Sequence, residues 1–295
     1  MVRANGIELG HDEAGAGPPL VFVHGSWSDR RSWDAVFPRF ATAGFRAIRY
    51  DRRGHGLSDQ VPGTLDDDAD DLAGLIEALG ASPAHVVGSS RGGAIALKLA
   101  AVLPEVFRTL TCHEPPLPKI VPANDPARPE LERVLLGERA VCDLISNGDH
   151  EAAARLFVEE VAFGEGGWTK LPERVRDSFV AHAETFLEEC QDPSATTVDL
   201  GALGRFDRPV LLTRGERSQL WYASVVRALA GALPSVITHV YRGAGHVPQA
   251  TLVGTYVRTL TAFLASADAG EEPDLGAEQL RRDEEHLSED HEDAD

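Results

Sequence analysis

The segment "VVGSSRGGAIAL", residues 86–97, joins a short apolar run to a run of small and apolar residues at helical spacing. The first run predicts a buried strand and the second a helix, with a tight turn at residues 88–93. Glycines flank that turn because a side chain there would collide with neighbouring backbone. In such an elbow the spacing G-x-S-x-G exposes the central serine, which selects Ser90 rather than Ser89. An ordinary serine in a glycine-rich turn is the alternative interpretation. The elbow predicts an α/β fold with Ser90 as a nucleophile.

The pattern on either side of the elbow extends this prediction to most of the chain. Amphipathic segments such as residues 70–80 and 92–103 lie between short apolar runs, which implies a mostly parallel sheet with helices on both faces. The alternation stops at residues 117–206, where helical patterns broken by Pro and Gly predict an inserted helical cap. Residues 1–116 and 207–266 then form the α/β core. The apolar runs that predict its strands are residues 19–25, 45–51, 84–90, 109–114, 209–216 and 236–246.

The negative charge of the chain is concentrated at its C-terminus. Of 47 acidic and 28 basic residues, 13 and 2 fall in residues 268–295, so this segment carries −11 of the net −19. Because it has few apolar residues to bury, residues 267–295 are predicted to be a disordered acidic tail. The acidic balance disfavours nucleic acid as a partner, since the phosphate backbone attracts basic surfaces.

Cysteine usage and the N-terminal segment point to a cytoplasmic protein. Cys112, Cys142 and Cys190 are odd in number and have no paired spacing, so neither a disulfide framework nor a metal site is indicated. The N-terminus has no apolar signal region, and no run reaches the roughly 20 apolar residues of a membrane span. A small-molecule substrate is the expected partner, and the state can be a monomer or a homodimer.

A serine nucleophile needs a base and a stabiliser for the negative charge that develops on the attacked oxygen. His246, in "GAGHVPQ", follows the last strand pattern and is the candidate base. The backbone N–H of Arg91, directly after the nucleophile, is one candidate for the oxyanion hole. The other is the N–H of Ser26, which follows a sharp turn at Gly25.

With these motifs in view, the chain resembles the α/β-hydrolase superfamily. The resemblance covers roughly residues 1–266 and rests on "HGSW", "DRRGHGLSD", "GSSRGG" and "GAGH" in the family's order. It implies a cofactor-free enzyme without a metal. It also raises a question, because the position where most members carry the triad acid is Ser218 here, and a serine cannot supply a negative charge.

Glu114 is the leading candidate for the missing acid. It ends the strand that follows the elbow helix, and parallel strands deliver their carboxyl ends to one side of the sheet. The run Cys112-His113-Glu114-Pro115-Pro116 is similar to the Cys-His-Glu-x-Pro pattern of fungal zearalenone lactonases, whose triad acid is the glutamate. Glu216, two residues before Ser218, is the alternative acid.

The sequence therefore predicts a serine hydrolase that cleaves a carboxylic ester or lactone through an acyl enzyme. Aromatic residues suggest an apolar or ring-bearing substrate, with Trp27 and Trp168 as candidate pocket residues. Two alternatives stay open. One is a non-hydrolytic enzyme, or a carbon–carbon bond hydrolase, on the same fold. The other is a non-catalytic ligand-binding protein, for which the serine at 218 is the argument.

Overall fold

A computed structural model describes residues 1–164 and 166–271 of the chain. The predicted acidic tail, residues 267–295, lies outside the described residues from residue 272 onward. Among the described residues, no helix combines the length and apolarity needed to cross a membrane.

The architecture is an α/β-hydrolase fold built on a seven-stranded sheet in the order β3-β5-β4-β6-β7-β8-β9. All neighbouring strands are parallel except β3, which pairs antiparallel with β5. A separate antiparallel hairpin, β1-β2, precedes the sheet. The strands are β1 (Val2–Ala4), β2 (Ile7–Leu9), β3 (His11–Ala14), β4 (Pro19–Val23), β5 (Arg46–Tyr50), β6 (Ala84–Ser89), β7 (Phe107–His113), β8 (Val210–Gly215) and β9 (Val236–Tyr241).

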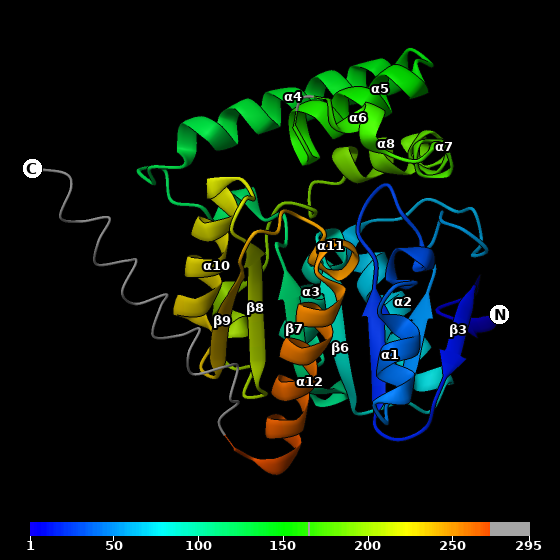
Figure 1. Cartoon of the computed structure of the whole chain (residues 1–295), viewed down its shortest axis with the longest axis vertical. Helices are drawn as coiled ribbons and strands as arrows, with labels where there is room; N and C mark the ends of the chain where they lie inside the picture. The colour runs from blue at the N-terminus through cyan, green and yellow to red at the C-terminus, as the bar shows by residue number, and fades with distance from the viewer. Residues whose placement is uncertain (165, 272–295) are drawn as a thin grey trace, which may run out of the picture.

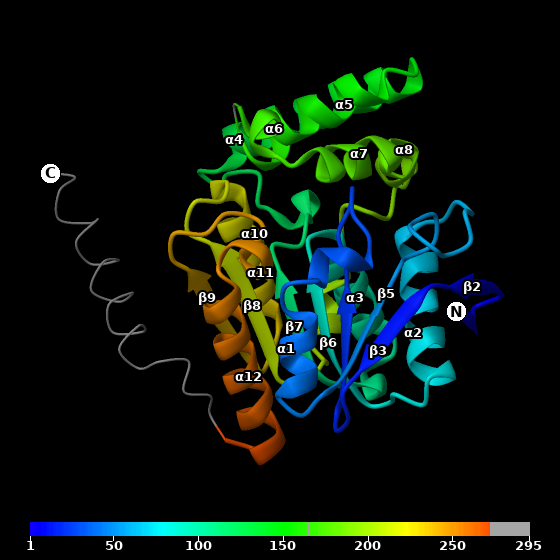
Figure 2. The same cartoon turned by 45° about the vertical axis from the view of Figure 1, so that its right-hand side comes forward.

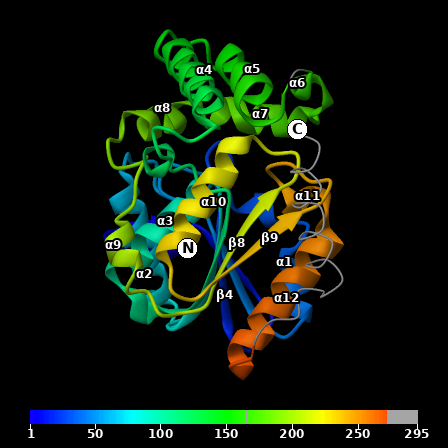
Figure 3. The same ribbon diagram turned by 90° about the vertical axis from the view of Figure 1, so that its left-hand side faces the viewer.

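Helices cover both faces of the sheet, as its apolar strands require (Figures 1 and 3). One face carries α2 (Leu65–Ala78), α3 (Arg91–Val102), α9 (Leu200–Leu203) and α10 (Leu220–Ala232), whose side chains form one apolar core with the strands. On the other face, α1 (Phe37–Thr42) and α12 (Val253–Ala269) form the second core. Short turns of helix complete the connections: η1 (Arg30–Trp33), η2 (Pro104–Val106), η3 (Pro118–Ile120) and α11 (Pro248–Thr251).

The helical insertion lies across the carboxyl edge of the sheet, as Figure 2 shows. Its elements are α4 (Arg128–Ser146), α5 (His150–Leu156), η4 (Phe157–Ala162), α6 (Gly167–Lys170), α7 (Glu173–Ala181) and α8 (Ala183–Gln191). The flanking segments contribute Leu117, Val121 and Phe206 to the apolar core on the α2, α3 and α10 face of the sheet, which the first turns of α4 also join through Leu131 and Val134. This packing favours a cap narrower than residues 117–206, and we propose that it comprises α4–α8.

Candidate active site

Ser90 lies at the turn between β6 and α3 in a strained conformation. Its backbone has φ 54° and ψ −125°, and it is the N-cap of α3. The flanking glycines are required by contact. A Cβ on Gly88 would lie 2.3 Å from the Gly92 carbonyl oxygen, and a Cβ on Gly92 would lie 2.2 Å from the Val23 carbonyl oxygen. The elbow therefore forces the chain to turn sharply and leaves Ser90 at the carboxyl edge of the sheet.

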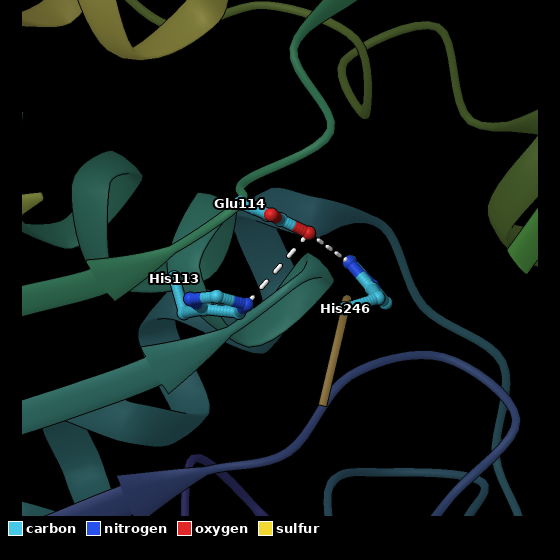
Figure 4. Close-up of side chains that lie close together, drawn as sticks. All are labelled: His113, Glu114 and His246. Carbon is cyan, nitrogen blue, oxygen red and sulfur yellow. Dashed lines mark hydrogen bonds and ion pairs between the residues drawn. The ribbon is translucent and has the colours of Figure 1, made fainter. Parts of the chain in front are cut away.

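The structure places Glu114 and His246 in direct contact, although 132 residues separate them. Nδ1 of His246 lies 2.5 Å from Oε2 of Glu114 (Figure 4). The other carboxylate oxygen accepts a hydrogen bond of 2.6 Å from the Gly215 amide. Glu114 is fully buried. The amide of Ser90 donates to the carbonyl oxygen of His113, 2.8 Å away, so the elbow is tied to the residue next to this acid.

The electrostatics of the pair fix the histidine tautomer. Burial by itself raises the pKa of Glu114, but the neighbouring imidazoles of His113 and His246 lower it to about 2. The carboxylate is thus ionised at neutral pH and can only accept hydrogen bonds. His246 must therefore donate from Nδ1, which leaves the lone pair of Nε2 available as a proton acceptor.

The same residues could be considered as metal ligands. Donor atoms of His113, Glu114 and His246 lie within 4.8 Å of one another. However, two ligands that each lie about 2.1 Å from one ion are more than about 3 Å apart. At 2.5 Å, Glu114 and His246 form a hydrogen-bonded pair rather than a pair that shares a metal ion.

Backbone strain is concentrated at this site. Among the described residues, the non-glycine residues with positive φ are Asn5, Trp27, Ser90 and Glu114. Ser90 and Glu114 directly follow β6 and β7, and Trp27 lies in the loop after β4. Each such conformation costs on the order of 1–3 kcal/mol and persists where the surroundings enforce it. Strain of this kind is typical of catalytic sites, where side chains are held in position before the substrate arrives.

Most of the chain matches one known protein family. Residues 18–251 match the family model described as alpha/beta hydrolase fold. The chain belongs to the α/β-hydrolase family. A relative that aligns over most of this hydrolase is the pimeloyl-[acyl-carrier protein] methyl ester esterase of Methylococcus capsulatus, which is 29% identical over 270 residues, 87% of this chain and 98% of that protein.

Another relative, BpoC of Mycobacterium tuberculosis, bears the name of a non-heme bromoperoxidase. It is 41% identical over 102 residues, which are 34% of this hydrolase and only 39% of BpoC. The crystal structure of BpoC superposes with a TM-score of 0.69 at 26% identity, over 88% of this chain and 97% of that one. A thermophilic esterase from Thermogutta terrifontis superposes with a TM-score of 0.74 at 23% identity, over 90% and 97% of the two chains, and this likeness bears on the fold alone.

The two predicted oxyanion-hole residues of this hydrolase share one buried anchor in the cap, Glu189 of α8. The Ser26 hydroxyl donates to Oε2 of Glu189, and Nε of Arg91 lies 3.2 Å from Oε1. Arg52 donates to the same Oε1 at 2.7 Å. Burial raises the pKa of Glu189, but Arg91 and Arg52 more than offset this, so the pKa is lowered and the carboxylate is charged.

The main chain at Gly25, next to Ser26, packs against the Ser90 elbow. A Cβ on Gly25 would lie 3.0 Å from the Ser90 Cβ. The Arg91 amide belongs to the first turn of α3 and has no intrahelical acceptor by position. Glu189 therefore holds the side chains of two residues whose main-chain amides are the oxyanion-hole candidates.

The loop after β8 contains Ser218 and Glu216, and the structure separates their surroundings. Glu216 accepts a hydrogen bond of 2.7 Å from the Gly243 amide in an exposed setting. Ser218 lies near Glu114 and its hydroxyl helps lower the pKa of that carboxyl, without a hydrogen bond of ordinary geometry. Of the two candidate acids, Glu114 is the one in contact with His246.

The candidate pocket residues lie in an aromatic cluster of the cap. The Trp27 ring packs on Phe186 and Phe157, with centroids 4.8 and 5.0 Å away. Trp168 belongs to the same apolar cluster, and both tryptophans are buried. Trp27 therefore connects the loop after β4 with the inner surface of the cap.

Three residues beside the site were not predicted. His113 has Nε2 3.7 Å from Glu114 and Nδ1 bonded to Thr213, and burial lowers its pKa to about 4. The Tyr222 ring stacks on His246 with centroids 5.3 Å apart. Glu189 could have been suspected from sequence, because it continues the buried stripe of Ala183 and Phe186 at helical spacing.

Proposed function

We propose that this protein is a cofactor-independent serine hydrolase that cleaves a carboxylic ester or lactone. The observation that carries the proposal is the hydrogen bond between the buried, ionised Glu114 and Nδ1 of His246 at the carboxyl edge that also holds the Ser90 elbow. An acid, a base and a strained serine of this kind make up a nucleophilic triad.

In the proposed mechanism, the Ser90 oxygen attacks the carbonyl carbon of the substrate while Nε2 of His246 takes the proton from the Ser90 hydroxyl. Glu114 stabilises the imidazolium that forms. The amides of Ser26 and Arg91 stabilise the oxyanion, an effect often worth several kcal/mol. His246 then gives the proton to the leaving alcohol, and water, activated by the same histidine, releases the acid from Ser90.

The names of relatives agree with ester chemistry, since a relative that aligns over most of this chain is named as a methyl ester esterase. The substrate that we propose is small and apolar or ring-bearing, because the cap contributes an aromatic cluster around Trp27 and Trp168. Lactones belong to the same proposal, because opening a cyclic ester uses the same steps.

A fluorophosphonate probe tests the nucleophile directly. We expect wild type to be labelled on Ser90, Ser90→Ala to resist labelling, and the matched control Ser89→Ala to react like wild type. Absence of labelling in folded wild type would favour a non-catalytic binding protein. A labelled protein that releases no acid from a panel of esters and lactones would favour a lyase, a cyclase or a carbon–carbon bond hydrolase.

A further inference from the structure

Helix α4 carries one carboxylate on its inward face. Its buried side chains Leu131, Val134, Val141 and Ile145 follow helical spacing and form a single stripe. Glu138 lies four residues after Val134 and three before Val141, so it occupies a position of this stripe where an apolar residue is expected. The stripe faces the molecule, and Glu138 faces it too.

The apolar stripe is interrupted at Glu138. On its N-terminal side, Leu131 and Val134 belong to the core that includes Trp221 of α10. On its C-terminal side, Val141 and Ile145 belong to the cap cluster around Trp27. Glu138 therefore lies where α4 passes from the core to the cap, between two apolar clusters.

Glu138 has no partner of its own within the described residues. It makes no hydrogen bond or ion pair there, its side chain is half-buried, and burial raises its pKa to about 7. Its carboxylate oxygens are not among the fully buried polar atoms without a partner in the described residues, so water reaches them and satisfies them. A donor group on a ligand could therefore take the place of water at this carboxylate.

Tyr222 connects Glu138 with the proposed catalytic centre. Its ring stacks on His246, 5.3 Å between centroids, and α10 packs against α4. Burial and the charges of Glu114 and Glu138 raise the pKa of the Tyr222 phenol, so this phenol lies within electrostatic reach of both carboxylates. Like Glu138, Tyr222 is half-buried and its hydroxyl makes no hydrogen bond within the described residues.

A hydrogen bond between the two helices holds α4 and α10 together. Oε2 of Glu130, in the first turn of α4, accepts a hydrogen bond of 3.0 Å from the amide of Trp221. This contact holds α4 against the start of α10, next to Tyr222. The inward face of α4 is thus positioned over the side of the site that carries His246.

We propose that Glu138, together with the Tyr222 hydroxyl, is a polar subsite that binds a hydrogen-bond donor, an amino or a hydroxyl group, on the substrate. The inference rests on the proposed ester or lactone hydrolysis and names its substrate class: an ester whose apolar body carries such a group away from the reacting carbonyl. A second carboxylate would be repelled there, because Glu114 and Glu138 already contribute negative charge.

The test compares methyl esters of straight-chain acids that end in a methyl, a hydroxyl or an amino group, at several chain lengths. For the best length we expect wild type to favour the hydroxyl or amino ester by about tenfold in kcat/KM. The Glu138→Leu variant is expected to reverse this order, because leucine completes the apolar stripe. Glu138→Gln should keep the hydroxyl preference and lose the amino preference. Glu132→Leu, an exposed position on the same helix, is the matched control and should keep wild-type rates and order.

Two outcomes would overturn the subsite: wild type that treats the three esters alike, or Glu138→Leu that slows all three equally. Binding of the same esters to Ser90→Ala by calorimetry separates this result from a failure of the proposed function. A donor preference in binding that disappears with Glu138→Leu, without any hydrolysis by wild type, would keep the subsite and refute ester hydrolysis. Hydrolysis without a donor preference would do the opposite.

Discussion

Replacing Glu114 by Gln is the sharpest test of the proposed triad. Both partners of the wild-type carboxylate are donors: the Gly215 amide at 2.6 Å from Oε1 and Nδ1 of His246 at 2.5 Å from Oε2. A glutamine of the same shape has one acceptor and one NH₂ group. One of the two contacts must then place a donor against a donor, or the histidine must change its tautomer.

The size of the effect follows from that conflict. If the glutamine NH₂ faces His246, the imidazole moves its proton to Nε2 and can no longer take the proton of Ser90. Loss of the stabilising charge together with the wrong tautomer is expected to lower kcat by about 10⁴, equivalent to about 5 kcal/mol in the activation barrier. The unmatched donor should lower the free energy of unfolding by about 1–3 kcal/mol.

The assay is steady-state hydrolysis of an active ester, together with the rate of fluorophosphonate labelling and with denaturant unfolding to show that the variant is folded. Glu216→Gln is the matched control, since Glu216 is exposed and its carboxylate accepts a hydrogen bond from the Gly243 amide alone among the described residues. This variant should retain kcat within about threefold. A folded Glu114→Gln enzyme with near-wild-type turnover would refute the reasoning, and a large loss in Glu216→Gln would move the acid to that residue.

Three further predictions concern the same centre. Because the pKa of Glu114 is lowered to about 2, its ionised form stabilises the fold fully above the ordinary pKa near 4.5, and this stabilisation is lost as the pH falls toward 2. The difference in unfolding free energy between wild type and Glu114→Gln should therefore narrow by up to about 3 kcal/mol over this pH range. A difference that stays constant with pH would contradict the prediction. Adding Ser218→Asp to Glu114→Gln should raise turnover at least tenfold above that of Glu114→Gln alone. In wild type the same substitution should lower the free energy of unfolding, measured with denaturant, because it places two carboxylates together. Turnover that does not recover would show that position 218 is not close to the acid site. Glu189→Gln should lower kcat about 10- to 100-fold and change KM less than threefold, because it weakens the contacts that hold the candidate oxyanion-hole residues Ser26 and Arg91. Glu188→Gln, on the exposed side of α8, should change neither kcat nor KM. Equal effects in the two α8 variants would mean that Glu189 is merely structural.

Much of the architecture could be predicted because strands and helices leave local patterns of apolar residues in the sequence. Continuous apolar runs predicted β4 to β9 to within a few residues, since strands buried on both faces leave no polar alternation. The antiparallel edge strand β3, residues His11–Ala14, was missed, because its half-exposed and mostly charged sequence carries no such signal. Sequence predicted helical segments within residues 117–206 but not their division, such as the break at His182 between α7 and α8.

The site divides in the same way. Glycine spacing identified the strained elbow at Ser90, and parallel topology by itself brought Glu114 to the edge where His246 also lies. Both inferences need only short-range sequence and one rule of chain geometry. Sequence favoured Glu114 and kept Glu216 as the alternative acid, because both lie near strand ends.

The tertiary structure decided what the sequence left open. It placed Glu114 against His246 and left Glu216 on an exposed loop amide. It also brought Glu189 from the cap onto Ser26 and Arg91. Such contacts join residues far apart in the chain through the packing of one layer on another. Local periodicity predicts which side of a helix is buried, but only the packing of the cap against the sheet determines which residues that side contacts.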